Sequence, residues 1–125
     1  MERLRFDAAA ARTPRDARLE RVTVAPLTAP LAAGADVQAS VFRLAPGGRI
    51  ARHSAEVPQV LAVLEGSGRV SGPNGEPVAV GPGDAVFWAE GEEHETVTDE
   101  GMTALVVESR GLRPFRPRPP GAGPE

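Results

Sequence analysis

Glycine and proline recur at short intervals along this chain of 125 residues, which contains 14 glycines and 13 prolines. Because both residues interrupt regular secondary structure, they divide the chain into brief extended pieces. The pieces between them are rich in valine and other apolar residues, as strands usually are. Several short strands at near-regular spacing predict an all-β fold, a sandwich or a barrel, in one domain with a modest core.

The strand signal is clearest from the middle of the chain onward. Val60 to Leu64 is a continuous apolar run, which is expected of a strand buried on both faces or of one in a barrel wall. The tetrad Gly72-Pro73-Asn74-Gly75 places proline at the second turn position and asparagine at the third, and it therefore predicts a hairpin. We expect strands at residues 37–44, 60–64, 69–71, 76–80, 85–88 and 103–107.

The two ends of the chain are less regular. Residues 13–16 resemble the start of a helix, whereas residues 19–24 alternate like a strand, so we expect a strand from about Leu19 and leave residues 8–18 unassigned. Residues 113–125 are too rich in proline to pack and are expected to be mobile. The predicted organisation is a partly ordered N-terminal arm at 1–18, a β-barrel at 19–112 and a Pro/Arg-rich disordered tail at 113–125.

Composition excludes several classes of function. The formal net charge of −3 argues against nucleic acid as a main partner. No apolar run approaches the roughly 20 residues of a membrane-spanning helix, and the start lacks a secretory signal, so we expect a cytoplasmic protein without a membrane partner. Cysteine, lysine and tyrosine are all absent, which excludes disulfides, thiolate ligands, Schiff-base lysine chemistry and tyrosine acid/base chemistry.

His53 and His94 are the only two histidines, and each lies in a segment framed by glycines. The first segment runs from residue 47 to 66 and the second from residue 83 to 98. Imidazole is the commonest metal ligand and the usual acid/base near neutral pH. These two positions are therefore the best functional lead in the sequence.

The two segments resemble the paired motifs of the cupin superfamily, whose members are small jelly-roll β-barrels. In the first segment, His53 matches the first histidine of the motif and Gly66 its closing glycine. Ala55 stands where a second histidine would be, and Gln59 where a glutamate would be. The resemblance covers roughly residues 37–108 and implies an all-β, single-domain cupin β-barrel of the jelly-roll type.

The second segment matches its motif at three positions and departs from it at two. Gly83, Gly91 and His94 are in register with the motif. Ala89 replaces a proline and Thr98 replaces an asparagine. With an intervening hairpin of suitable length, the two segments together are a strong fold signal.

Metal-binding cupins usually hold the metal with three histidines and one glutamate, so the resemblance implies a reduced metal site of His53, Gln59 and His94. We expect it to bind a divalent transition metal, namely Zn, Fe, Mn or Ni. A carboxylate ligand would have to come from the turn around His94, which looks solvated and contains Glu92, Glu93 and Glu95. The alternative is a hydrogen-bonded pair of histidines in a polar barrel mouth without metal.

Strand alternation also predicts where individual side chains point. It places four residues of the first segment on one face, which we expect to line the barrel: His53, Ala55, Val57 and Gln59. Trp88 and Phe42 are expected in the core, although Trp88 could also form a pocket wall. Glu108, at the end of an apolar strand, is expected to be exposed or paired.

Two functions from different classes stay open. The first is a small metal-dependent enzyme, of the oxygenase, isomerase or cyclase type, that acts on a small organic molecule. The second is a non-catalytic module, either a small-molecule-binding barrel or an accessory cupin without a functional metal. A metal-free acid/base enzyme that uses the two imidazoles is a third alternative. Because open sheets need their edges covered, we also expect a homodimer.

Overall fold

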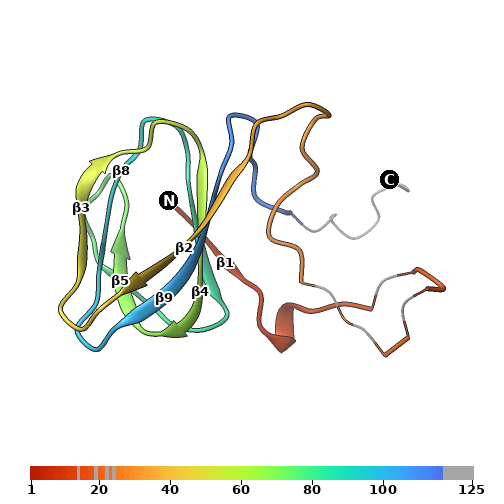
Figure 1. Cartoon of the computed structure of the whole chain (residues 1–125), viewed down its shortest axis with the longest axis horizontal. Coiled ribbons are helices and arrows are strands. Elements are labelled where there is room, and N and C mark those ends of the chain that lie inside the picture. Colours follow the sequence, from red (N-terminus) through yellow and green to blue (C-terminus); the bar gives the residue numbers. More distant parts are fainter. Residues whose placement is uncertain (14, 19, 22, 24, 117–125) are drawn as a thin grey trace.

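The computed structural model describes residues 1–13, 15–18, 20–21, 23 and 25–116. These residues form two antiparallel sheets that stand face to face as a barrel (Figure 1). The elements are β1 (Glu2–Arg5), the 3-10 helix η1 (Ala8–Ala10), β2 (Gln38–Leu44), β3 (Arg49–Ser54), β4 (Gln59–Gly66), β5 (Gly68–Ser71), β6 (Val78–Val80), β7 (Asp84–Trp88), β8 (Glu93–Val97) and β9 (Met102–Glu108). None of the described segments is a helix long and apolar enough to cross a membrane.

The core lies between the two sheets. The larger sheet has the strand order β1-β7-β4-β9-β2, and the smaller has the order β3-β8-β5-β6. Because alternate residues of a strand point to opposite faces, one face of each sheet supplies the core. Leu61 and Val63 of β4 belong there to the same cluster as Val70 of β5 and Trp88 of β7. The fold is all-β and of the jelly-roll barrel type, as predicted.

The larger sheet is also covered on its outer face. Val60 and Ala62 of β4 point away from the barrel and pack in a second cluster with Ala85 and Leu112. This second cluster explains why the sequence from Val60 onward is continuously apolar instead of alternating. The prediction of a strand buried on both faces is therefore confirmed for the first half of β4, whereas Leu64, near its end, is exposed.

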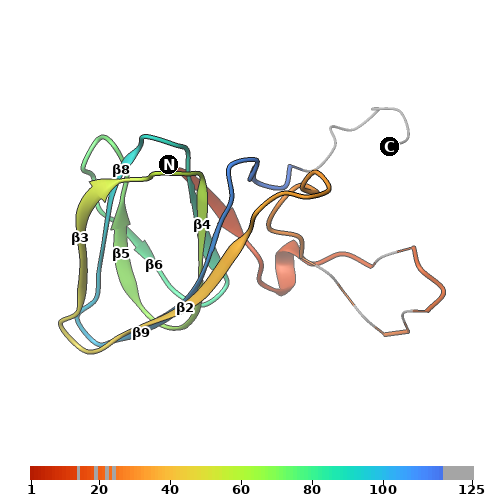
Figure 2. The ribbon, with the colours of Figure 1, turned by 45° about the horizontal axis from the view of Figure 1, so that its top comes forward.

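Residues 25–37 and 109–116, which we call the covering segments, run side by side over this outer face (Figure 2). The backbone N–H of Ala29 donates to the carbonyl oxygen of Arg113 at 3.0 Å, and that of Phe115 donates to Leu27 at 2.9 Å. These bonds satisfy backbone groups that lie beside the buried apolar cluster. The covering segments are thus a fixed part of the described structure.

Most of the predicted strands are confirmed. The hairpin over residues 72–75 joins β5 to β6, and the N–H of Gly75 donates to the carbonyl oxygen of Gly72 at 3.0 Å. The second strand of this hairpin begins at Val78, two residues later than predicted. Phe42 is not a core residue, since 38% of its surface is exposed on the outermost strand of the larger sheet.

The predicted strand from Leu19 is wrong for the residues that are described there. Glu20, Arg21 and Thr23 lie outside any strand, and the φ angle of Arg21 is 57°, in the left-handed region that interrupts an extended chain. Leu19, Val22 and Val24 lie outside the described residues. The first strand is instead β1, within the predicted N-terminal arm, so the barrel is not confined to residues 19–112.

The predicted disordered tail is wrong for its first four residues. Pro114 is buried and forms an isolated β-bridge with Thr28. Arg116 donates a hydrogen bond to Glu2 at 2.6 Å. Backbone pairing with the covering segment at residues 25–37 therefore gives these residues a defined place despite their proline content. Residues 117–125 of the predicted tail lie outside the described residues.

Two glycines with the same backbone conformation allow a matched test of this packing. Gly66 and Gly75 have φ angles of 78° and 75°. A Cβ atom at Gly66 would overlap the carbonyl oxygen of Gly101, whereas nothing lies within 4 Å of a Cβ atom at Gly75. We expect Gly75→Ala to lower the free energy of unfolding by about 1–2 kcal/mol through the positive φ alone. Gly66→Ala should cost at least about 3 kcal/mol because the backbone must also shift.

Urea unfolding of the two variants beside the unmodified protein checks this expectation. Equal losses at the two positions would contradict the close approach at Gly66.

Candidate ligand site at the mouth of the barrel

Four strands bring polar residues to one end of the barrel. β3 ends just after His53, and β9 ends at Glu108. β4 begins at Gln59, and β8 begins just before His94. All four side chains line one inner cavity of about 60 Å³, which Trp88 closes on its apolar side. The three predicted site residues are therefore brought together.

The two histidines face each other across neighbouring strands. His53 of β3 and His94 of β8 are register partners, and their ring centroids lie 4.3 Å apart at an interplanar angle of 56°. A register shift between Ile50 and His53 lets both of these residues line the cavity, although they are three positions apart. The site is thus anchored in the smaller sheet.

Each histidine is fixed by a hydrogen bond to its own strand or to the turn before it. The Nδ1–H of His53 donates to the carbonyl oxygen of Ala51 at 2.7 Å, and that of His94 donates to Glu92 at 3.1 Å. Because a carbonyl oxygen only accepts, Nδ1 carries the proton in each neutral ring and Nε2 carries the lone pair. Among the described residues, neither Nε2 has a hydrogen-bond partner. Metal-binding histidines are commonly held in this way.

His94 is the more deeply buried of the two, with 3% of its surface exposed. Its ring stacks on Trp88 of the opposite sheet, with centroids 4.4 Å apart and planes 26° from parallel. Trp88 is thus both a core residue and a wall of the cavity. Burial lowers the pKa of His94 below its ordinary value, and the neighbouring His53 lowers it further. His94 is therefore neutral at pH 7, and its Nε2 can accept a proton or bind a cation.

Gln59 reaches the cavity from the opposite sheet, and not along the strand of His53 as the alternation argument predicts. β3 ends at Ser54, and the chain then turns before β4 begins. Ala55, at the motif position of the second histidine, is 3% exposed and belongs to the apolar core. Val57 lines only the outer rim. Two facing sheets, rather than one strand, unite His53 with Gln59.

Glu108 is a site residue that sequence reasoning missed. It is the register partner of Gln59 on one side and of Gln38 on the other. It is partly buried and lines the inner cavity with the two histidines, which the expectation of an exposed or paired residue did not anticipate. The sequence does contain a signal for this position. Alternate residues of a strand share a face, and Glu108 therefore lies on the same face of β9 as Ala104 and Val106, which face the core.

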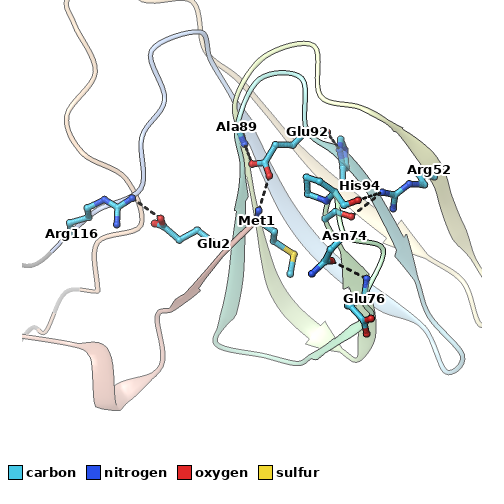
Figure 3. A network of polar contacts seen from close by, with 11 residues as sticks. Met1, Glu2, Arg52, Asn74, Glu76, Ala89, Glu92, His94 and Arg116 are labelled. Atoms are coloured by element: carbon cyan, nitrogen blue, oxygen red, sulfur yellow. Dashed lines mark hydrogen bonds and ion pairs between the residues drawn. The ribbon is translucent and has the colours of Figure 1, made fainter.

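The glutamates beside His94 are engaged elsewhere. Glu93 pairs with Arg52 at 3.3 Å, and Glu95 lies 4.0 Å from Arg49. Glu92 accepts hydrogen bonds from the ammonium of Met1 at 2.8 Å and from the Ala89 N–H at 2.7 Å (Figure 3). Burial opposes ionisation of Glu92, but these two donors hold its pKa below the ordinary value. The three carboxylates shape the turn and do not line the cavity.

The donors at the cavity are therefore two imidazoles, the Gln59 amide and the Glu108 carboxylate. Within the part of the chain that is described, no three His, Cys, Asp or Glu side chains are grouped closely enough to hold a metal ion. An outer chamber of about 230 Å³ adjoins the inner cavity and shares His53, Gln59 and Glu108 with it. The fold and site thus define a small jelly-roll barrel with paired histidines at an open mouth.

A family model for the cupin domain matches residues 40–108, which is more than half of the chain. The chain therefore belongs to the cupin domain family, as its motifs predict. The match spans β2 to β9 and contains every residue of the inner cavity. No curated protein matches the chain.

Several solved structures also resemble part of this chain. The polyketide cyclase RemF from Streptomyces resistomycificus is 33% identical, with a TM-score of 0.55 over 68% of this chain and 65% of that one. DMSP lyase DddQ from Ruegeria pomeroyi DSS-3 is 28% identical, with a TM-score of 0.55 over 58% and 38% of the two chains. KdgF from Halomonas sp. is 25% identical, with a TM-score of 0.56 over 60% and 69%. This chain thus spans less than two thirds of the cyclase and of the lyase.

The buried position of His94 leads to a pH prediction. Its lowered pKa means that, as the pH falls through 6.5, the unfolded chain takes up the proton before the folded protein does. The free energy of unfolding should be highest above pH 6.5 and should fall as the pH drops toward the folded pKa. NMR titration of the His94 ring in EDTA-treated protein should give a midpoint below 6.5.

Urea unfolding at several pH values measures this fall in the free energy of unfolding independently of the NMR titration. His94→Asn should flatten the pH dependence of unfolding below pH 6.5. A midpoint at or above 6.5 would contradict the argument from burial.

Proposed function

We propose that this protein binds a divalent transition metal ion through Nε2 of His53, Nε2 of His94 and the side-chain oxygen of Gln59, and acts on a small organic molecule. The observation that carries the proposal is the pair of Nδ1–H bonds to backbone carbonyls, which leaves two lone pairs at one cavity. Imidazole nitrogens suit Zn, Fe and Ni, and an amide oxygen completes a weak third position. The donor set therefore fits a metal, with open positions for water or substrate.

A bound metal would supply Lewis acidity, which polarises a substrate oxygen or activates water. The chain's own residues do the rest. The stacked Trp88 keeps the His94 ring in one orientation and excludes water from that side. Glu108 presents a carboxylate at the junction between the inner cavity and the outer chamber. A substrate group entering from the mouth therefore meets two imidazoles and one hydrogen-bond acceptor.

The similar structures support chemistry on a small organic molecule. A polyketide cyclase and a DMSP lyase share the fold with this chain at 33% and 28% identity. We propose the class that these two have in common, which is a cupin enzyme acting on a small molecule at the barrel mouth. The oxygenase, isomerase and cyclase types predicted from the sequence all fall within this class.

A metal-free binding module is the second candidate. One observation favours it: the described residues provide no group of three His, Cys, Asp or Glu side chains for a metal ion. In this case the two histidines and Gln59 would bind the ligand by hydrogen bonds alone. Measurement of metal content separates the two candidates.

We expect the purified, tag-free protein to contain about one transition metal ion per chain, measured by elemental mass spectrometry. His53→Ala and His94→Ala should each lower the metal content at least tenfold, because each removes one of two imidazole ligands. Ser54→Ala, at the same mouth, is the control and should retain the metal. Protein that stays metal-free after incubation with Zn²⁺, Fe²⁺, Mn²⁺ and Ni²⁺ would eliminate the proposed metal site.

A second test addresses Gln59 alone. Gln59→Glu restores a negative charge beside the two imidazoles and should tighten metal binding by about tenfold or more. Gln38→Glu adds the same charge farther out, on the other side of Glu108, and should change the affinity little. Competition titration with a chromophoric chelator measures both. Equal affinities for Gln59→Glu and the unmodified protein would remove Gln59 from the ligand set.

The remaining expectations stay predictions. β2 is the outermost strand of the larger sheet and leaves Val41 and Phe42 exposed, and proteins usually cover such an edge. A second copy of the chain is the partner that the sequence predicts there. The cytoplasmic location and the absence of nucleic-acid and membrane partners are proposed on composition alone.

A further inference from the structure

A second cleft lies outside the barrel, next to the mouth. It measures about 390 Å³ and is lined by the start of β2 with the residues before it and by the turn after β9. The residues that matter for its chemistry are Asp36, Val37, Gln38, Val57, Glu108 and Arg110. Neither cupin motif contains this turn or the residues before β2, so the motifs do not account for the cleft.

The cleft adjoins the histidine site. Glu108 lines the cleft, the outer chamber and the inner cavity, and Val57 lines the cleft and the outer chamber. A molecule lying in the cleft is therefore separated from the outer chamber by no more than the side chains that both spaces share.

The sizes of these spaces decide how such a molecule would lie. The inner cavity of about 60 Å³ holds only a few water molecules, at roughly 10–15 Å³ each. It admits a single functional group of a ligand and not its body. The cleft of about 390 Å³ falls in the range of small-molecule pockets, roughly 300–1,000 Å³. The outer chamber of about 230 Å³ lies below this range, so we expect the body of the ligand to lie in the cleft.

The lining of the cleft defines the ligand's chemistry. Most of the surface is apolar, from Val37, Val57 and neighbouring small residues. Two carboxylates, Asp36 and Glu108, outnumber the single guanidinium of Arg110, which disfavours an anion. Hydrogen-bond acceptors thus predominate among the charged groups.

We propose that this cleft binds the body of an extended, mostly apolar molecule whose hydroxyl group donates a hydrogen bond to Glu108. Asp36 and Glu108 select against anionic ligands. The reacting end of the molecule reaches the inner cavity, and this last step alone rests on the proposed function. Binding in the cleft needs no metal.

The test uses the full chain, treated with EDTA, and three matched probes: 2-naphthol, 2-methoxynaphthalene and 2-naphthoate. We expect 2-naphthol to shift the backbone amide NMR signals of Gln38, Ser109 and Arg110 in a saturable way. The methyl ether, which has no donor, should bind about tenfold more weakly because it loses one hydrogen bond to a charged acceptor. The anion should bind more weakly still. The absence of saturable shifts with 2-naphthol would overturn the proposal.

Two tryptophan substitutions provide a matched pair. Val37 and Val41 are 50% and 49% exposed, but only Val37 lines the cleft. Val37→Trp should weaken 2-naphthol binding at least tenfold, and Val41→Trp should leave it unchanged. Val57→Trp, from another wall of the cleft, replaces Val37→Trp if that variant does not fold. Equal affinities for the Val37 and Val41 variants would overturn the assignment of the cleft.

One further variant tests the polar contact. Glu108→Gln should weaken the binding of 2-naphthol but not that of 2-methoxynaphthalene, and equal effects on both would overturn the role of Glu108. The metal content of the protein is measured separately. If 2-naphthol binds in the cleft but the protein binds no metal, only the proposed function is contradicted. If the protein binds metal but 2-naphthol does not bind in the cleft, only this inference is contradicted.

Discussion

The antiparallel pairing of β3 with β8 is the interaction on which the site depends. Its register places His53 directly opposite His94, and the irregularity after Ile50 turns His53 to the same face. Each ring is then fixed by a carbonyl oxygen two residues before it. A shift of this register by one residue would move one ring to the outside of the barrel, because side chains alternate along a strand. The backbone, more than any network of side chains, therefore determines where the two histidine rings lie.

The opposite sheet completes the site and depends on the covering segments. Trp88 and Gln59 belong to the neighbouring strands β7 and β4, whose outer faces pack under Leu112 and other apolar residues of the covering segments. The same segments supply Val37 and Ser109 to the outer cleft. The residues that cover the larger sheet thus also shape the approach to the cavity, so stability of that sheet and ligand access depend on the same part of the chain.

The sequence predicts the elements whose signals are local. The hairpin over residues 72–75, the apolar start of β4 and the two histidine frames depend on neighbouring residues, and the structure confirms them. β1 was missed because it is only four residues long and is stabilised by pairing with β7, far along the chain. The residues from Leu19 alternate in polarity as a strand would, but the left-handed backbone conformation of Arg21 interrupts a strand there. The alternation of polar and apolar residues contains no information about that φ angle.

Glu108 is a carboxylate that a comparison with the motif does not detect, because it lies on the strand next to the motif position. The motif leads one to expect a carboxylate at residue 59, where this chain has glutamine. Cross-strand pairing places Glu108 directly beside Gln59 on the neighbouring strand, facing the same cavity. The mouth therefore keeps one negative charge, but at the junction with the cleft instead of next to the imidazoles. A carboxylate there is better placed to accept a hydrogen bond from a molecule in the cleft than to share a cation with both histidines. The substitution at residue 59 thus weakens the metal site, while Glu108 provides polar recognition at the mouth.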